Sequence, residues 1–99
     1  MEPGLLPVLT ALANPHRLRL IAALAGGSTY VSQLARDLQL SRPMVHLHLR
    51  RLEEAGLIVG RLELSPDGKA MRFFDVAPFA LTVTPDLIRD AVATMTEDE

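Results

Sequence analysis

The chain has 99 residues, of which 48% are hydrophobic, and its formal net charge at pH 7 is −2. This length fits one domain, residues 1–99, with a small hydrophobic core. Cysteine is absent, which excludes disulfide bonds, thiolate metal sites and cysteine nucleophiles. No basic segment precedes the first apolar run, so we expect a cytoplasmic protein without a secretory signal or a membrane span.

The charges are distributed unevenly along the chain. Nine of the ten Lys and Arg residues lie between positions 15 and 72, together with five Asp and Glu residues. Residues 73–99 contain one basic residue and six acidic ones. The basic middle region favours a polyanionic partner such as nucleic acid, although ordinary surface charge would also explain it.

Two helices are predicted at the N-terminus. Residues 3–13 contain more leucines than one buried stripe of a small monomer needs, so some should contact a partner. Asn14 is a good N-cap and Pro15 a good first residue for a second helix, residues 15–25, which ends at a Gly-Gly pair. We expect the core-facing residues of this second helix to be Leu18, Ile21, Ala22 and Ala25.

A helix-turn-helix is predicted next. Residues 30–40 read as a short helix with Val31, Leu34, Ala35 and Leu38 facing inward, and residues 42–55 as a second helix with Val45, Leu49 and Leu52 facing inward. Ser41 caps the second helix and Gly56 ends it. Two helices joined by so short a turn place the second one in the major groove of DNA.

Two segments together resemble the ArsR/SmtB family of winged-helix repressors. They are ALANPHRLRLI at residues 11–21 and LSRPMVHLHLRRLEEAGLI at residues 40–58, with Leu34 and Ala35 matching between them. The resemblance covers about residues 5–76, and the pairing of the two segments is more specific than either alone. It implies a winged helix-turn-helix, DNA binding by the second helix of the motif, and a dimer.

Beyond this motif the hydrophobic period changes to alternation. Residues 58–64 and 71–76 alternate around the turn residues Pro66, Asp67 and Gly68, which predicts a β-hairpin, the wing, over residues 58–76. A connector follows, and Thr84 caps a last helix, residues 85–96. The expected fold is therefore mainly α with a two-stranded wing, in the order α-α-α-α-β-β-α.

The three histidines raise the alternative of a metal site, because many members of the resembled family sense metals. His46 and His48 lie two residues apart on a helix, so they point in different directions and cannot chelate one ion. The family's thiolate site needs cysteines, and its other common site uses histidines of the last helix, which has none here. We predict no metal ligand and no cofactor, and a structural role for His48. A nickel- or zinc-type site formed by His16 and carboxylates of the C-terminal tail or of a partner stays open, as in a metal-responsive regulator.

No glycine-rich nucleophile turn or phosphate loop occurs, so we predict that the protein is not an enzyme. The predicted function is a sequence-specific transcriptional regulator that binds double-stranded DNA. The candidate DNA-binding residues are Ser41, Arg42, Pro43, His46, Leu47, Arg50, Arg61, Lys69 and Arg72. Net acidity favours the alternative, a winged-helix interaction or assembly module that needs an accessory protein.

A homodimer is predicted from the first and last helices, residues 3–13 and 85–96. Their apolar residues exceed what a small core absorbs, which indicates a partner surface. The candidate interface residues are Leu5, Leu6, Leu9, Leu12, Leu87, Ile88, Val92 and Met95. A two-fold axis between these helices would space two recognition helices by about 34–36 Å and so requires an inverted-repeat operator.

Overall fold

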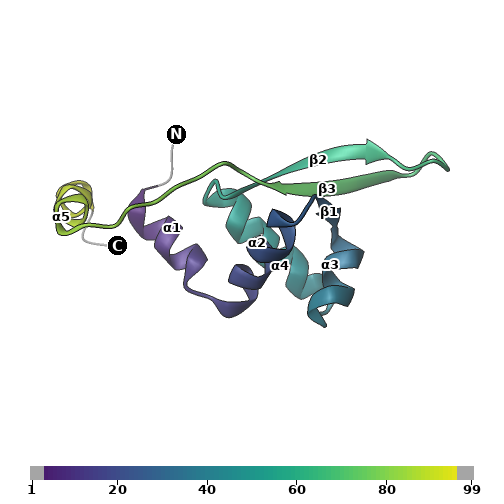
Figure 1. Cartoon of the computed structure of the whole chain (residues 1–99), viewed down its shortest axis with the longest axis horizontal. Helices are drawn as coiled ribbons and strands as arrows, with labels where there is room; N and C mark the ends of the chain where they lie inside the picture. Colours follow the sequence, from purple (N-terminus) through teal and green to yellow (C-terminus); the bar gives the residue numbers. More distant parts are fainter. Residues whose placement is uncertain (1–3, 96–99) are drawn as a thin grey trace.

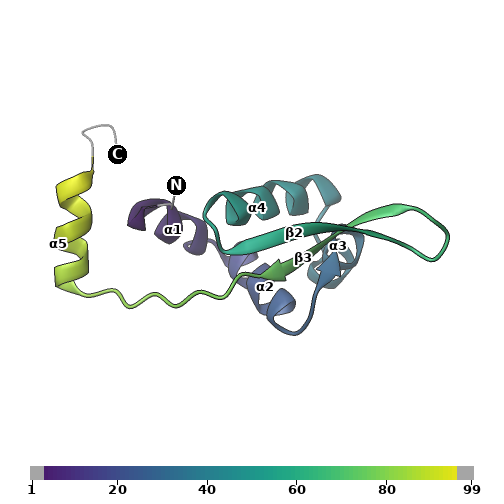
Figure 2. The ribbon, with the colours of Figure 1, turned by 90° about the horizontal axis from the view of Figure 1, so that it is seen from above.

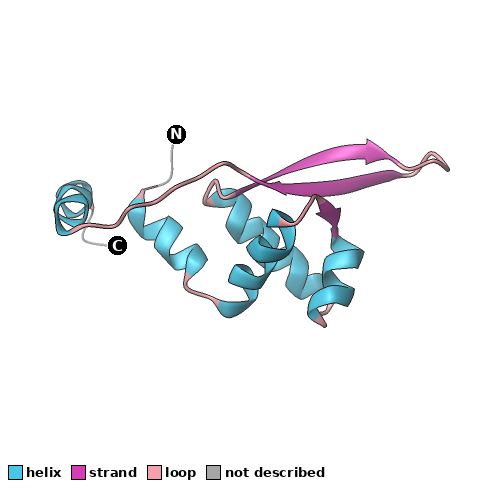
Figure 3. Cartoon of the chain, viewed as in Figure 1, coloured by secondary structure: helices cyan, strands magenta, loops and turns pink. Residues whose placement is uncertain are grey.

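The computed structural model describes residues 4–95 and contains five helices and three strands (Figures 1 and 3). In chain order they are α1 (Leu5–Leu12), α2 (Pro15–Ala25), β1 (Thr29–Tyr30), α3 (Val31–Leu38), α4 (Arg42–Glu54), β2 (Ile58–Leu64), β3 (Ala70–Val76) and α5 (Pro85–Thr94). The predicted fold is confirmed, with β1 as an addition. The expected helix ends at Pro3 and Thr96 lie outside the described residues.

Local signals in the sequence account for the helix boundaries. The side chains of Asn14, Ser41 and Thr84 each accept a hydrogen bond from a backbone N–H in the first turn of α2, α4 and α5. Gly56 follows α4 with a φ of 76°, a left-handed conformation that glycine adopts without a Cβ clash. The predicted caps and stop are therefore confirmed.

The sheet has the strand order β1-β3-β2 and is antiparallel throughout. Strands β2 and β3 form the predicted hairpin, in which Ile58 is paired with Val76 and Leu64 with Ala70. Strand β1 adds a short third strand at the base, where Tyr30 pairs with Phe73. Two residues are too few to show a strand period, so the sequence did not predict β1.

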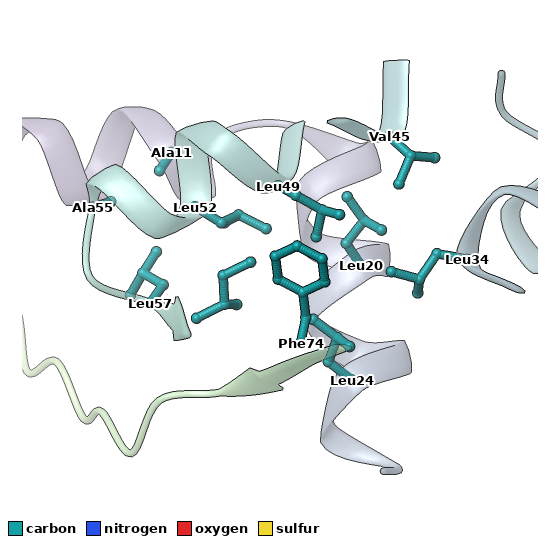
Figure 4. Packing of buried hydrophobic residues seen from close by; sticks show 11 residues of the cluster. Ala11, Leu20, Leu24, Leu34, Val45, Leu49, Leu52, Ala55, Leu57 and Phe74 are labelled. Carbon is teal, nitrogen blue, oxygen red and sulfur yellow. The ribbon is translucent and has the colours of Figure 1, made fainter. Parts of the chain in front are cut away.

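The core lies where α2, α3 and α4 meet the base of the hairpin. Figure 4 shows the ring of Phe74 among leucines of α2 and α4. The largest fully buried side chains are Leu20, Leu34, Leu49, Leu52, Ile58 and Val45. The inward faces predicted for α3 and α4 are confirmed, because Leu34, Val45, Leu49 and Leu52 are buried and Val31, Ala35 and Leu38 pack against them.

The face predicted for α2 is wrong. Leu20 and Leu24 are buried, whereas Leu18 is 52% exposed and Ala22 and Ala25 are exposed. Only Ile21 of the predicted set packs against the core. This helix is apolar at nearly every position after Arg19, so its periodicity does not distinguish one face from another.

Helix α5 lies at the end of the molecule opposite the tip of the hairpin (Figures 1 and 2). An extended connector, residues 77–84, carries the chain from β3 to α5, and the molecule measures 52 × 26 × 25 Å. No residue of α5 is buried. Among residues 4–95, no helix is long and apolar enough to cross a membrane.

Candidate nucleic-acid interface

The orientation of α4 follows from its two faces. Val45, Leu49 and Leu52 are held in the core, so the opposite side of the helix must face solvent. Only residues 39–41 separate α3 from α4. Gln39 turns the chain with a left-handed φ of 55°, and Ser41 caps α4. The packing of α3 and the core thus presents one face of α4 to the outside.

The exposed face of α4 carries the predicted DNA-binding residues of this helix. Ser41 lies just before the helix, and its hydroxyl accepts the Met44 N–H at 3.4 Å. Among the described residues, the guanidinium groups of Arg42 and Arg50 have no carboxylate partner and no side-chain hydrogen bond, which leaves them available for a ligand. The residues exposed here are Ser41, Arg42, Pro43, Met44, His46, Leu47 and Arg50.

His48 lies on the opposite, buried side of α4. It is 4% exposed, and its ring centroid is 5.5 Å from that of His16. The Arg17 Nη1 atom donates to His48 Nδ1 at 3.2 Å, while His48 Nε2 is buried without a hydrogen-bond partner. Burial, the Arg17 charge and His16 lower the pKa of His48. The predicted structural role of His48 agrees with this burial.

Arg17 connects three helices. Besides His48 of α4, its guanidinium binds the C-terminal end of α1, with Nε donating to the Ala11 carbonyl at 2.7 Å and Nη2 to the Thr10 carbonyl at 3.2 Å. A cation that binds the last carbonyls of a helix satisfies acceptors that have no partner within the helix. The contacts of Arg17 with α1 and α4 indicate a structural role.

The three basic residues of the wing differ in their surroundings. Arg61 binds Glu63 at 2.9 Å, pairs with Asp75 and donates to the Ser28 hydroxyl at 3.1 Å. Arg72 binds Glu53 of α4 at 2.9 Å. Lys69 is exposed at the turn and makes no ion pair with the described residues. Two of the three predicted wing cations are therefore already engaged within the protein.

The predicted dimer residues gather around a groove between α1 and α5. Its lining includes six of them, namely Leu5, Leu6, Leu9, Ile88, Val92 and Met95. The other two lie elsewhere: Leu12 packs against the core, and Leu87 does not line the groove. Val92 is 56% exposed and Ile88 45% exposed, so apolar surface of α5 remains uncovered in the monomer.

The metal-site alternative finds no support among residues 4–95. They contain no group of three or more His, Asp and Glu residues that could hold an ion. His16 lies against the ring of His48, whose Nδ1 atom is bound by the Arg17 guanidinium, so an ion held by these histidines would have to displace that cation. The tail carboxylates at 97–99, which the open alternative includes, lie outside the described residues.

The sequence matches a family model described as bacterial regulatory protein, arsR family, over residues 14–59. An HTH-type transcriptional regulator of Methanocaldococcus jannaschii is 34% identical over 79 residues, covering 80% of this chain and 82% of that protein. The chain belongs to the ArsR family. Another HTH-type transcriptional regulator, from Mycobacterium tuberculosis, is 39% identical over 88 residues and covers 79% of this chain and 82% of its own.

Solved structures agree with the ArsR-family fold. The winged helix-turn-helix DNA-binding domain of a Mycobacterium bovis protein, described as homodimeric, aligns with a TM-score of 0.64 and 24% identity over 88% of this chain and 70% of its own. Reduced HlyU from Vibrio cholerae aligns with a TM-score of 0.63 and 23% identity over 89% of this chain and 81% of its own. This ArsR-family protein is thus a winged helix-turn-helix transcriptional regulator, as predicted, and its family is not one of enzymes.

Proposed function

We propose that this ArsR-family regulator binds an inverted-repeat DNA operator as a homodimer, with α4 of each subunit in the major groove. The observation that carries the proposal is the outward face of α4, where Arg42 and Arg50 are exposed and unpaired among the described residues. Arginine is the commonest reader of guanine in the major groove, through O6 and N7. A helix N-terminus with exposed polar groups also suits the phosphate backbone.

The candidate contacts divide by chemistry. Arg42, His46 and Arg50 can donate hydrogen bonds to base edges, Ser41 to phosphate, and Pro43 and Leu47 can contact thymine methyl groups. On the wing, Lys69 remains a candidate phosphate contact because its ammonium is unpaired within residues 4–95. Arg61 and Arg72 are committed to carboxylates, so a role in DNA binding would require them to exchange these partners.

Replacement of Arg42 and of Arg50 by alanine tests the proposal. A DNA duplex is first selected from a random library by the wild-type protein, and affinity is measured at several salt concentrations. Each variant should lose about 1–3 kcal/mol of binding free energy and discriminate less at one base position. Wild-type log affinity should fall linearly with log salt.

Arg19→Ala is the matched control, since Arg19 is exposed on α2 and also has no ion pair among the described residues. It should bind the duplex like the wild type. If Arg42→Ala and Arg50→Ala also bind like the wild type, α4 is not the reading element. If the wild type binds no duplex at low salt, the protein is an interaction module instead.

The homodimer is supported by the groove between α1 and α5. A small domain that leaves Ile88 and Val92 exposed on one helix gains stability when a second copy covers them. A structural neighbour described as homodimeric has the same fold, which adds support. Both α1 and α5 lie at the end of the molecule away from the tip of the wing, so a two-fold axis there leaves both wings free (Figure 1).

A further inference from the structure

The wing carries no excess of positive charge. Residues 58–76 contain three basic and three acidic side chains. Arg61 is paired with Glu63 and Asp75, and Arg72 binds Glu53, so of the three wing cations only Lys69 makes no ion pair with the described residues. Electrostatic attraction to phosphates is therefore a weak explanation for DNA binding by this hairpin, and another kind of contact must be considered.

The alternation of side chains along the hairpin defines its two faces. The side chains of residues that pair across two strands lie on the same face of the sheet. One face of the hairpin therefore carries Gly60, Leu62 and Leu64 of β2 together with their partners on β3, which are Phe74, Arg72 and Ala70 in this order. At the base this face is part of the core, since Phe74 is 2% exposed. Arg72 reaches from the same face to Glu53 of α4. The face therefore looks toward the recognition helix.

Beyond the core the same face is apolar and uncovered. Leu62 is 73% exposed and Leu64 is 75% exposed, more than the other large apolar residues of the described chain. Figures 1 and 2 show that the tip of the hairpin projects past the helices. Two exposed leucines next to each other on one face of a projecting strand lower the solubility of a protein, so their presence indicates a contact surface.

The position of the leucines relative to α4 indicates which partner they meet. Glu53 binds Arg72, which lies on the same face of the hairpin as the two leucines, here called the leucine face. Glu53 is three residues from Arg50 on α4, and residues at this spacing share one side of a helix. The leucine face and the proposed base-reading face of α4 are thus turned to the same side. A duplex held by α4 would meet the hairpin at its neighbouring groove.

We propose that Leu62 and Leu64 are the DNA contacts of the wing, and that they enter the minor groove next to the major groove occupied by α4. The inference rests on the proposed function. Proteins that bind the minor groove often insert leucine or another apolar side chain at a base step, which partly unstacks the step and bends the duplex. Flexible pyrimidine–purine steps at that position would be preferred, so the leucines contribute to sequence preference without a hydrogen bond.

The double variant Leu62→Ser with Leu64→Ser tests this assignment on the duplex selected by the wild type. Both side chains are exposed, so the fold and the dimer should persist, as checked by circular dichroism and sedimentation. Affinity should fall about tenfold or more while the slope of log affinity against log salt stays unchanged, because no phosphate contact is lost. The bend measured by circular permutation of the site should decrease.

Two controls separate this role from others. Val59→Ser removes an apolar side chain that is 55% exposed on the opposite face of β2, and it should bind like the wild type. Lys69→Ala should lower the salt slope by about 1 if the lysine binds a phosphate. Wild-type affinity in the double leucine variant, or a loss of affinity that coincides with dissociation of the dimer, overturns the inference. Absence of DNA binding by the wild type overturns the proposed function itself.

Discussion

His48 of α4 lies in an environment without a negative charge among the described residues. It is buried, it accepts a hydrogen bond from Arg17, and its facing titratable or charged groups are Arg17 and His16 of α2. No carboxylate among the described residues pairs with it. The imidazole is therefore kept neutral, because a protonated ring would lie beside the Arg17 cation without solvent.

This environment predicts a loss of stability in mild acid. The pKa of His48 is lower in the folded protein than its usual value of 6.5, so the unfolded chain takes up the proton first as the pH falls. The contribution is fully present above about pH 6.5 and is lost below it, at up to about 1.4 kcal/mol for each pH unit. Urea unfolding between pH 7.5 and 5.0 measures it.

His48→Asn is the informative comparison, since the asparagine oxygen can accept from Arg17 and does not titrate in this range. The variant should lose less stability than the wild type over the same pH interval. Parallel pH profiles would show that His48 is not responsible.

At the scale of the element, α4 has a buried face and an exposed face on opposite sides. The buried face binds the helix to α2 and the sheet, while the exposed face carries the unpaired arginines. Because both faces belong to one helix, the packing of α4 in the core determines the positions of the proposed base-reading residues. Leucines two positions apart, Leu47 and Leu49, belong to the two different faces.

Alanine at these two leucines should therefore have different effects. Leu49→Ala removes a side chain that is 1% exposed and should lower the free energy of unfolding by about 2–5 kcal/mol. Leu47→Ala should cost about 1 kcal/mol or less in stability, because its side chain is already 39% exposed, but it should weaken binding to the selected duplex. Urea unfolding gives the stabilities. Equal costs at the two positions would contradict the orientation of α4.

At the scale of the whole molecule, the uncovered apolar surface at α1 and α5 is the main feature that the monomer leaves unexplained. Helix α5 is joined to the domain by an extended connector and buries none of its residues. An isolated helix of ten residues is not stable in water by itself, so its packing must come from tertiary or quaternary contacts. In the proposed dimer, a second copy of the chain would provide these contacts.

The double variant Ile88→Asp with Val92→Asp should abolish the dimer. Ile88 and Val92 line the groove, so each aspartate would place a charge in an apolar interface. Sedimentation at micromolar concentration should show a dimer for the wild type and a monomer for the variant. Ala93→Asp, at an exposed position of α5 outside the groove, should remain dimeric. A monomeric wild type would remove both the dimer and the inverted-repeat operator.

The sequence alone determined where α2, α4 and α5 begin, the turn of the hairpin and the inward faces of α3 and α4, whereas α3 is shorter than the predicted residues 30–40. These features depend on local chemistry: Asn14, Ser41 and Thr84 cap the helices through nearby N–H groups, and Gly56 supplies a conformation that other residues avoid. The amphipathic pattern of α4 was strong enough to separate Leu49 from Leu47, and the same pattern located the candidate reading residues.

Only the tertiary structure decided the rest, because it depends on which distant residues meet. The buried face of α2 needed the positions of the neighbouring helices, since that segment is apolar nearly all around. The pairing of Arg17 with His48 and of Arg61 with Asp75 joins residues that no local spacing relates. The exposure of Leu62 and Leu64 follows from where the hairpin leaves the core, which alternation along a strand does not reveal.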